Sequence, residues 1–316
     1  MSNRRRKRVL TWHVHGNYLY YLTQSDHDFY LPVKPGKPEG YGGRAGTLPW
    51  GSNVYEIDAE DVKRSAFDII LYQSHKNYLE DRLEILSEAQ IRRLPQIFLE
   101  HGPPRQHPAD TKHPVDDPNM LLVHVTHFNQ LMWDSSRTPT IVIEHGVIVP
   151  EDAAYSGELE RGITVVNNIA RRGRRTGADV FRYASQRVPL DLVGMNASDL
   201  GGYGEIPYHQ LLQFESRYRF FFNPIRYTSL GLAVCEAMMI GMPIIGLATT
   251  EMPAVIQNGV TGYIDTNLDR LVACMQHLLD DPGEAKRLSE NARAYALEHF
   301  NIQRFARDWD QAFSQF

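Results

Sequence analysis

Short apolar runs alternate with amphipathic stretches along almost the whole chain. This alternation is typical of α/β folds with parallel sheets, because each buried strand is followed by a helix that returns the chain. The runs that predict strands are Val9–Val14, Asp68–Gln73, Gln96–Glu100, Leu121–Thr126, Thr140–Ile143, Ile163–Asn167, Leu190–Val193, Tyr218–Phe222 and Pro243–Ile245. The stretch from Val149 to Gly162 carries little strand signal. The sequence therefore predicts two α/β domains, residues 1–149 and 150–316.

Helical periodicity is clearest near the end of the chain. Apolar residues recur at the helical period over Leu268–Asp280, and Pro282-Gly283 separates this segment from a second predicted helix, Glu284–His299. A last helix is predicted over Ile302–Phe316. It presents three aromatic residues on one face, Phe305, Trp309 and Phe313. We expect this face to dock onto another surface of the protein.

One segment departs from the α/β pattern. Residues Lys34 to Gly51 contain six glycines and three prolines. A loop this long inside a compact domain is usually either functional or disordered, and the sequence leaves both alternatives open. If the loop is functional, an acceptor-facing role is the hypothesis we retain.

Composition narrows the class of protein. With 316 residues, 42% hydrophobic and 22% charged, the chain resembles a globular protein of two domains, and its net charge of -5 gives no reason to expect a nucleic-acid partner. Cys235 and Cys274 are the only cysteines, which argues against disulfides and cysteine metal sites. No apolar run approaches the roughly 20 residues needed to cross a bilayer, so we expect a cytoplasmic protein. The basic run Arg4–Arg8 is either a solvated terminus or a peripheral contact with anionic lipid.

The strongest candidate for chemistry follows the predicted strand Tyr218–Phe222. There the stretch Asn223–Met238 passes through a turn containing Gly231 and opens a helix. Backbone N–H groups around Leu230–Ala233 could hold a diphosphate, because helix starts attract anions. Glu236 lies about one turn into the helix, where its carboxylate could accept hydrogen bonds from a ribose diol. The alternative is a glutamate that faces solvent.

A basic cluster follows the predicted strand Ile163–Asn167. It runs from Arg171 to Arg175 with Gly173 at its centre. The planar guanidinium group matches phosphate oxygens, and Gly173 would permit a close approach. We favour a diphosphate clamp over a solvated loop.

Several motifs carry a resemblance to a known family. They are Glu236-Ala237-Met238, Gly241-Met242-Pro243-Ile244-Ile245 and Glu251–Gly262, preceded by Phe98–Gly102, Ile143–Val147 and Leu192-Val193-Gly194. Together they resemble the donor-site signature of the glycogen-synthase-like retaining glycosyltransferases, the "group 1" family. The resemblance extends over roughly residues 163–300 and is thin over the first 95. It implies the GT-B architecture, in which two Rossmann-like domains face each other across a cleft and the C-terminal helix packs back.

The resemblance also implies roles for individual residues. Glu236 is similar to the family's acidic residue that binds the nucleotide ribose, and Arg171 to an arginine that faces the diphosphate. The family's lysine aligns with Thr176-Gly177, so Arg174 or Arg175 would have to replace it. The helix-start residues Ser229, Leu230, Gly231 and Leu232 would complete the donor site. His101 resembles a histidine near the transferred sugar, and Gly16 resembles a close-approach glycine on the N-terminal side.

Position 228 departs from the family pattern. The signature has two glutamates separated by seven residues, and the first would stand where this chain has Thr228. A hydroxyl can form a neutral hydrogen bond of about 1 kcal/mol, against roughly 1.5–3 kcal/mol for a charged one. A loss of about 1–2 kcal/mol slows a reaction roughly 5- to 30-fold. We therefore expect Thr228 to contact the donor sugar in a weakened or retuned catalytic site.

The predicted function is transfer of a sugar from a UDP- or GDP-type donor to a glycan, lipid-linked or protein acceptor, with retention. Asp116-Asp117 and Asp280-Asp281 look like loop and helix-end acids, so neither a metal nor another cofactor is expected. One alternative is a non-catalytic homologue that kept nucleotide binding, which Thr228 and the missing lysine favour. A second is a sugar-nucleotide epimerase. His75 and His145 are weaker candidates for substrate contact than His101.

Overall fold

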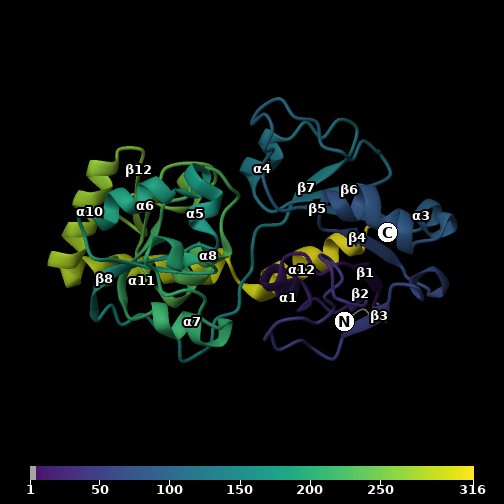
Figure 1. The fold of residues 1–316 in the computed structure, drawn as a ribbon, viewed down its shortest axis with the longest axis horizontal. Coiled ribbons are helices and arrows are strands. Elements are labelled where there is room, and N and C mark those ends of the chain that lie inside the picture. The colour runs from purple at the N-terminus through teal and green to yellow at the C-terminus, as the bar shows by residue number, and fades with distance from the viewer. Residues whose placement is uncertain (1–4) are drawn as a thin grey trace. The chain divides into compact units, whose positions relative to one another are not determined.

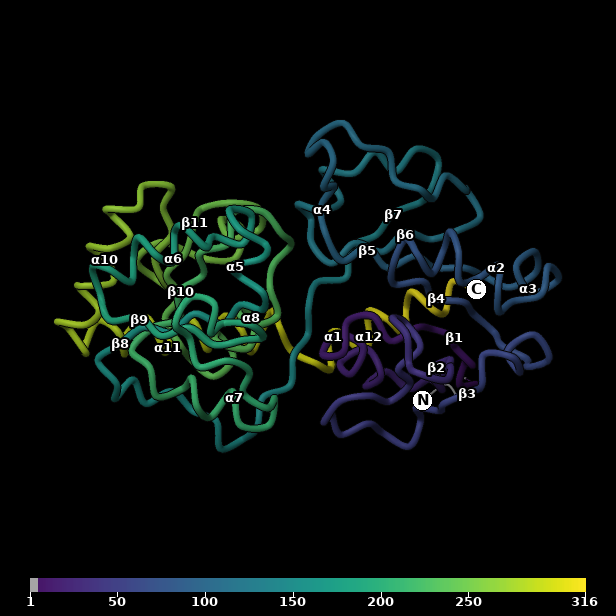
Figure 2. The backbone as a smooth tube through the Cα atoms, in the orientation of Figure 1, coloured from purple at the N-terminus to yellow at the C-terminus, as the bar shows by residue number. Residues whose placement is uncertain are grey.

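The chain divides into two compact units. In a computed structural model that describes residues 5–316, Met1–Gly146 and Ile302–Phe316 form the N-terminal unit, and Val147–Asn301 form the C-terminal unit. Arg4, the first residue of the predicted basic run, lies outside the described residues. The colour along the tube in Figure 2 shows the return: the last segment, in yellow, lies with elements of the N-terminal unit. The division at Gly146 lies beside the predicted boundary after residue 149.

The N-terminal unit is built on a seven-stranded sheet with the order β3-β2-β1-β4-β5-β6-β7. Each pair of neighbours is parallel. The strands are β1 (Arg8–Thr11), β2 (Asp28–Val33), β3 (Val54–Asp58), β4 (Ile69–Tyr72), β5 (Gln96–Glu100), β6 (Leu121–His124) and β7 (Thr140–Val142). A parallel sheet with the central strands buried on both faces is the Rossmann-like arrangement expected from the apolar runs.

The C-terminal unit holds a five-stranded sheet with the order β12-β11-β10-β8-β9, again with parallel neighbours. The strands are β8 (Leu159–Val165), β9 (Leu190–Val193), β10 (Tyr218–Asn223), β11 (Ile244–Leu247) and β12 (Gly262–Asp265). Every residue of β10 is buried, as befits the central strand of the sheet. The two parallel sheets confirm the predicted fold class of two Rossmann-like domains.

Helices connect the strands in both units. In the N-terminal unit they are α1 (Gly16–Leu22), η1 (Val62–Arg64), the π-helix η2 (Asn77–Asp81), α2 (Arg82–Ile85), α3 (Glu88–Arg93), α4 (His127–Met132) and α12 (Ile302–Phe313). In the C-terminal unit they are α5 (Ile169–Arg172), η3 (Gly173–Thr176), α6 (Ala178–Ser185), η4 (Ala197–Leu200), α7 (Tyr208–Glu215), α8 (Leu232–Ile240), α9 (Met252–Val255), α10 (Leu268–Asp280) and α11 (Pro282–His299). No helix within residues 5–316 is long and apolar enough to span a bilayer.

The last helix packs where its aromatic face indicated. Phe305, Trp309 and Phe313 are each fully buried, and α12 contacts α1 in the N-terminal unit. Figure 1 shows the yellow α12 next to the purple α1. The prediction that the C-terminal helix packs back onto another part of the protein is confirmed.

The glycine-rich segment after β2 is ordered in the structure. The Tyr41 side chain is only 1% exposed and belongs to the core of the N-terminal unit. The His13 N–H donates to the Gly40 carbonyl oxygen at 3.2 Å, which ties the segment to the end of β1. These contacts favour a defined loop around Tyr41 over the disordered alternative for Lys34–Gly51.

The sequence interpretation missed β2, β3 and β12 and placed the start of β8 too late. β3 and β12 are edge strands, and their mixed polar and apolar residues resemble loop sequence. β2 contains Pro32, and proline usually argues against a strand because it has no backbone N–H to donate. Pro32 lies beyond the β2 residues that pair with β1, so no N–H is needed towards β1. β8 begins at Leu159, inside the stretch that we assigned to the domain boundary, because its first half carries exposed charged residues.

Candidate functional site

Two loops of the C-terminal unit meet at the carboxyl ends of neighbouring strands, β8 and β10. The carbonyl oxygen of Arg175, in the first loop, accepts hydrogen bonds from the N–H groups of Arg226 (3.0 Å) and Tyr227 (3.2 Å) in the second. In open α/β sheets ligands bind at this edge. The structure thus brings the basic cluster beside the loop that leads into α8.

A glycine makes this packing possible. Gly177 has a φ of +79°, and a Cβ atom there would lie only 1.9 Å from the carbonyl oxygen of Pro224. Any larger residue would push the two loops apart. Gly173 also has a positive φ, but a Cβ there would meet no described atom within 4 Å. The space that a Cβ at Gly173 would occupy is therefore open.

Two arginines share one carboxylate at this edge. Arg226 donates to both oxygens of Asp179, at 2.5 and 2.7 Å, and Arg174 donates to Asp179 at 2.7 Å. The Arg226 hydrogen bonds hold the pKa of Asp179 below its ordinary value. The three groups together keep one net positive charge. We did not predict Arg226, although an arginine in the loop after a central strand is a signal that could have identified it.

The other two arginines of the predicted clamp differ in exposure. The Arg171 side chain, on α5, is 67% exposed, and its Nε lies 3.8 Å from Asp199 Oδ2. Arg175 is half-buried between the loops. The clamp residues therefore lie on neighbouring elements, and both exposed arginines already have carboxylate partners, Asp179 for Arg174 and Asp199 for Arg171.

The start of α8 lies directly after the second loop. Its N-cap residue Gly231 has an extended backbone, with φ -73° and ψ 138°. The first-turn N–H groups of a helix have no acceptor within the helix and form the positive end of its dipole. Thr228 and Ser229 are half-buried in the segment just before this start, whereas the Leu230 side chain is buried. The predicted residues Thr228–Leu232 thus form one continuous turn into the helix.

Glu236 does not face solvent. Its side chain is buried, at 3% exposure, which rules out the solvent-facing alternative. A second buried acid, Glu215 at the end of α7, has no hydrogen-bond partner for either carboxyl oxygen among the described residues. Burial, followed by the charge of Glu236, raises the pKa of Glu215 well above its ordinary value. Sequence reasoning missed Glu215, because a single acid at a helix end carries no signal of burial.

The remaining two predicted site residues lie in the N-terminal unit. His101, just after β5, has its ring centroid 4.2 Å from that of His15 and 4.8 Å from that of Tyr18. Tyr18 also contacts His145, at 5.7 Å. Gly16 is the first residue of α1, directly after His15, and a Cβ atom on Gly16 would lie 3.1 Å from His13 Nε2. Gly16 and His101 therefore border one cluster of aromatic and histidine rings.

The protonation of His101 follows from its surroundings. Burial, together with the neighbouring His15, lowers the pKa of His101 well below its ordinary value, so the imidazole is neutral at pH 7. Its Nε2 lies 3.3 Å from Gln73 Oε1. The Gln73 amide nitrogen donates to the Trp12 carbonyl oxygen, which can only accept, so Oε1 must face His101. The proton of His101 is therefore on Nε2.

His75, a weaker candidate for substrate contact, pairs with a buried carboxylate. It lies with His113 around the buried Glu100 rather than in the ring cluster of His101. This is the group of possible metal ligands that residues 5–316 contain.

Comparison with known proteins finds a family match in the C-terminal unit. Residues 199–295 match the family model described as Glycosyl transferases group 1, and this range includes Thr228 and Glu236. The MMP alpha-(1->4)-mannosyltransferase of Mycolicibacterium hassiacum is 35% identical over 86 residues, which are 26% of this chain. The matched segment spans only 21% of that relative.

Solved structures share the architecture over the whole chain. Sucrose-phosphate synthase from Thermosynechococcus elongatus has a TM-score of 0.70 at 16% identity, covering 98% of this chain and 99% of that one. HepE from Anabaena, in complex with UDP, has a TM-score of 0.70 at 12% identity and covers 99% and 100%. A glycosyltransferase from Rickettsia africae gives 0.70 at 12%, with 99% of both chains. The chain has the GT-B fold of these glycosyltransferases, and its residues 199–295 match the model of the group 1 glycosyl transferases.

Proposed function

We propose that this protein transfers a sugar from a nucleotide-diphosphate sugar to a glycan, lipid-linked or protein acceptor, with retention and without a metal ion. The observation that carries the proposal is the buried Glu236 in α8, whose start adjoins the arginine-rich loop after β8. Both the helix start and Glu236 lie in the segment that matches the family model.

Each group has a chemical task in this proposal. The N–H groups at the start of α8 and the positive charge of the Arg174–Asp179–Arg226 cluster stabilise the diphosphate as it leaves. Glu236 accepts hydrogen bonds from the ribose hydroxyls. His101, neutral at pH 7, contacts the sugar from the N-terminal unit by a hydrogen bond rather than by charge. Thr228 offers the donor sugar a neutral hydroxyl.

UDP is the first nucleotide to test, with GDP as the alternative. HepE, which shares the fold, has been solved with UDP and with UDP-glucose. That likeness is the reason to test a uridine donor first.

A thermal-shift panel with UDP, GDP, ADP and dTDP tests the donor site. A nucleotide present at about 100 times its Kd should stabilise the folded protein by roughly 2.7 kcal/mol. In Glu236→Gln the charge-assisted hydrogen bonds are lost, which should weaken binding about 10- to 100-fold. Glu290→Gln, an exposed glutamate on α11, is the matched control and should bind as the wild type does. Absence of any response to all four nucleotides would contradict the proposal.

A non-catalytic nucleotide-binding role is the second candidate, and Thr228 is the observation that favours it. The hydroxyl cannot supply the charge that a glutamate brings to the donor sugar. Release of UDP from UDP-glucose, with and without added acceptors, distinguishes the two. Nucleotide binding without sugar release or transfer from any donor tested would favour the non-catalytic role. Formation of a new sugar nucleotide without an acceptor would instead indicate an epimerase.

A further inference from the structure

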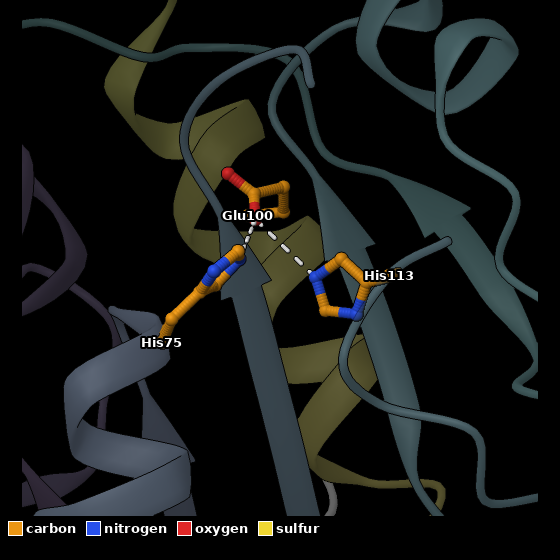
Figure 3. Close-up of side chains that lie close together, drawn as sticks. All are labelled: His75, Glu100 and His113. Atoms are coloured by element: carbon orange, nitrogen blue, oxygen red, sulfur yellow. Dashed lines mark hydrogen bonds and ion pairs between the residues drawn. The ribbon is translucent and has the colours of Figure 1, made fainter. Parts of the chain in front are cut away.

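Three ionisable side chains from separate segments meet at the carboxyl end of β5 in the N-terminal unit. Glu100 is the last residue of β5, His75 precedes the π-helix η2, and His113 belongs to the loop before β6. Figure 3 shows the two imidazoles on either side of the Glu100 carboxylate. The Nε2 atoms of His75 and His113 each lie 3.2 Å from Glu100 Oε2.

The Glu100 carboxylate is buried and accepts hydrogen bonds on both oxygens. Oε1 accepts the N–H of Gly102 at 2.9 Å, while Oε2 faces the two imidazoles. Burial opposes ionisation, but the hydrogen bonds from His113, His75 and Gly102 outweigh it and lower the pKa of Glu100 to about 2. The carboxylate is therefore charged at neutral pH and holds its partners with charge-assisted bonds.

The position of the proton on His113 shows whether the three side chains form a metal site or a hydrogen-bonded cluster. Burial lowers the pKa of His113, so the ring is neutral at pH 7. Its Nδ1 accepts the N–H of Val115 at 3.1 Å, which leaves the ring proton on Nε2, directed at Glu100. In a metal-bound histidine the nitrogen that does not bind the metal usually donates its proton to an acceptor, whereas Nδ1 of His113 accepts a hydrogen bond. The group is therefore a set of donors around a carboxylate, not a set of metal ligands.

The same turn is held from two further directions. Trp133 Nε1 donates to the carbonyl oxygen of Gly102 at 2.8 Å, and the Trp133 ring packs edge-on against His113 at 5.1 Å. On the other side, Gln73 Oε1 accepts from His101 Nε2. The residue between Glu100 and Gly102 is His101 itself. The hydrogen bonds at Gly102 and the contact of His101 with Gln73 thus restrict where the His101 imidazole can lie.

We propose that Glu100 is the positioning residue for His101, with His113 and His75 as its two side-chain hydrogen-bond donors. This inference rests on the proposed function, in which His101 contacts the transferred sugar. Glu100 does not touch the substrate in this scheme. It fixes the backbone turn so that the neutral His101 ring presents one orientation, and misplacement of a reacting group by about 1 Å can cost roughly 100-fold in rate.

The test compares Glu100→Gln, His113→Leu and His113→Gln with the control His107→Leu, whose side chain is exposed in the loop after Gly102. Glu100→Gln puts an amide N–H₂ against either the Gly102 N–H or the two imidazole N–H groups, so at least one hydrogen bond must be lost. We expect kcat to fall about 10- to 100-fold in Glu100→Gln and His113→Leu, with the Kd for UDP unchanged. His113→Gln keeps an N–H donor and should recover most of the activity. A general loss of folding would instead change the Kd for UDP as well.

Imidazole nitrogen NMR keeps this inference separate from the proposed function. The His101 resonances should shift in Glu100→Gln and His113→Leu but not in His107→Leu, whether or not the wild type shows turnover. Unchanged His101 resonances together with unchanged kcat would overturn the positioning role. A Zn²⁺ titration that displaces the Nε2 protons of His75 and His113 would also overturn it, because the group would then be a metal site. Absence of turnover in the wild type would count against the proposed function alone.

Discussion

Glu215 sits at the end of α7 with both carboxyl oxygens buried and without hydrogen-bond partners among the described residues. An acid in such a place keeps its proton, because the charged form would lose its hydration without compensation. The neighbouring Glu236 adds to this effect, since two like charges close together disfavour each other. Glu215 is therefore expected to stay protonated beside Glu236 at neutral pH.

The pH dependence of stability follows from that raised pKa. Below the unfolded-state pKa of about 4.3 both states hold the proton, so the group contributes nothing. As pH rises above this value, Glu215 ionises in the unfolded state but not in the folded state. The free energy of unfolding then falls by up to about 1.4 kcal/mol per pH unit. We expect Glu215→Gln to gain stability over the wild type between pH 4 and pH 7, measured by urea unfolding.

The exposed Glu298→Gln on α11 is the control, and its stability should follow the wild type at both pH values. The test compares the stability difference between Glu215→Gln and the wild type at pH 4 with the same difference at pH 7. The effect of exchanging a carboxyl for an amide is present at both pH values and therefore cancels. Parallel pH profiles for Glu215→Gln and the wild type would show that Glu215 ionises normally.

At the scale of secondary-structure elements, a buried arginine joins β10 to the end of α10. Arg219 is 5% exposed, and its guanidinium donates to the carbonyl oxygens of Gly157 (2.9 Å), Leu278 (3.1 Å) and Leu279 (3.0 Å). The last carbonyl groups of a helix have no partner within it and carry the negative end of its dipole. Arg219 therefore caps α10 from inside the unit.

Replacing this arginine should be costly. Arg219→Met keeps much of the side-chain volume but leaves buried carbonyl groups unsatisfied, so we expect a loss of about 2–4 kcal/mol in the free energy of unfolding. Arg217→Met removes an exposed ion pair with Glu158 and should cost less than about 1 kcal/mol. Urea denaturation of both variants measures the difference, and equal losses would contradict the capping role.

The elements also show how far sequence patterns reach. Continuous apolar runs identified mostly buried strands with the bounds that the structure has, namely the central β5 and the edge strand β9, whose four residues are all buried. Edge strands such as β3 escaped because one face meets solvent and the burial pattern becomes irregular. In the same way, motifs located Glu236, but neither Arg226 nor Glu215, because their partners depend on packing between segments distant in sequence.

At the scale of the whole molecule, the N-terminal unit is assembled from two separate parts of the chain. Trp309, from the second part, is fully buried, and its Nε1 lies 3.3 Å from the hydroxyl oxygen of Tyr18 in the first part. Around it, the Phe305 ring contacts Tyr18 at 5.5 Å, and Phe313 contacts Phe29 at 6.3 Å. The second part thus completes the hydrophobic packing of the N-terminal unit.

Trp309→Ala should destabilise that unit alone. Removing a buried tryptophan typically costs about 3–5 kcal/mol. We expect hydrogen exchange to show faster opening of β1 and β2, while β8 and β10 in the C-terminal unit keep their protection. Leu297→Ala, a half-exposed position on α11, should leave both units unchanged. Uniformly faster exchange throughout the chain would mean that the two units unfold as one.

The discontinuous N-terminal unit also sets an order of events during synthesis. The ribosome finishes Val147–Asn301 before it makes Ile302–Phe316, so the C-terminal unit has all of its residues while the N-terminal unit still lacks α12. Domains often fold during translation in the order of their appearance, beginning at the N-terminus. Here the N-terminal unit is completed after the C-terminal unit, although its synthesis begins first. The nascent N-terminal unit keeps an uncovered apolar surface near α1 until α12 leaves the exit tunnel. This interval is when the nascent chain has most need of a chaperone.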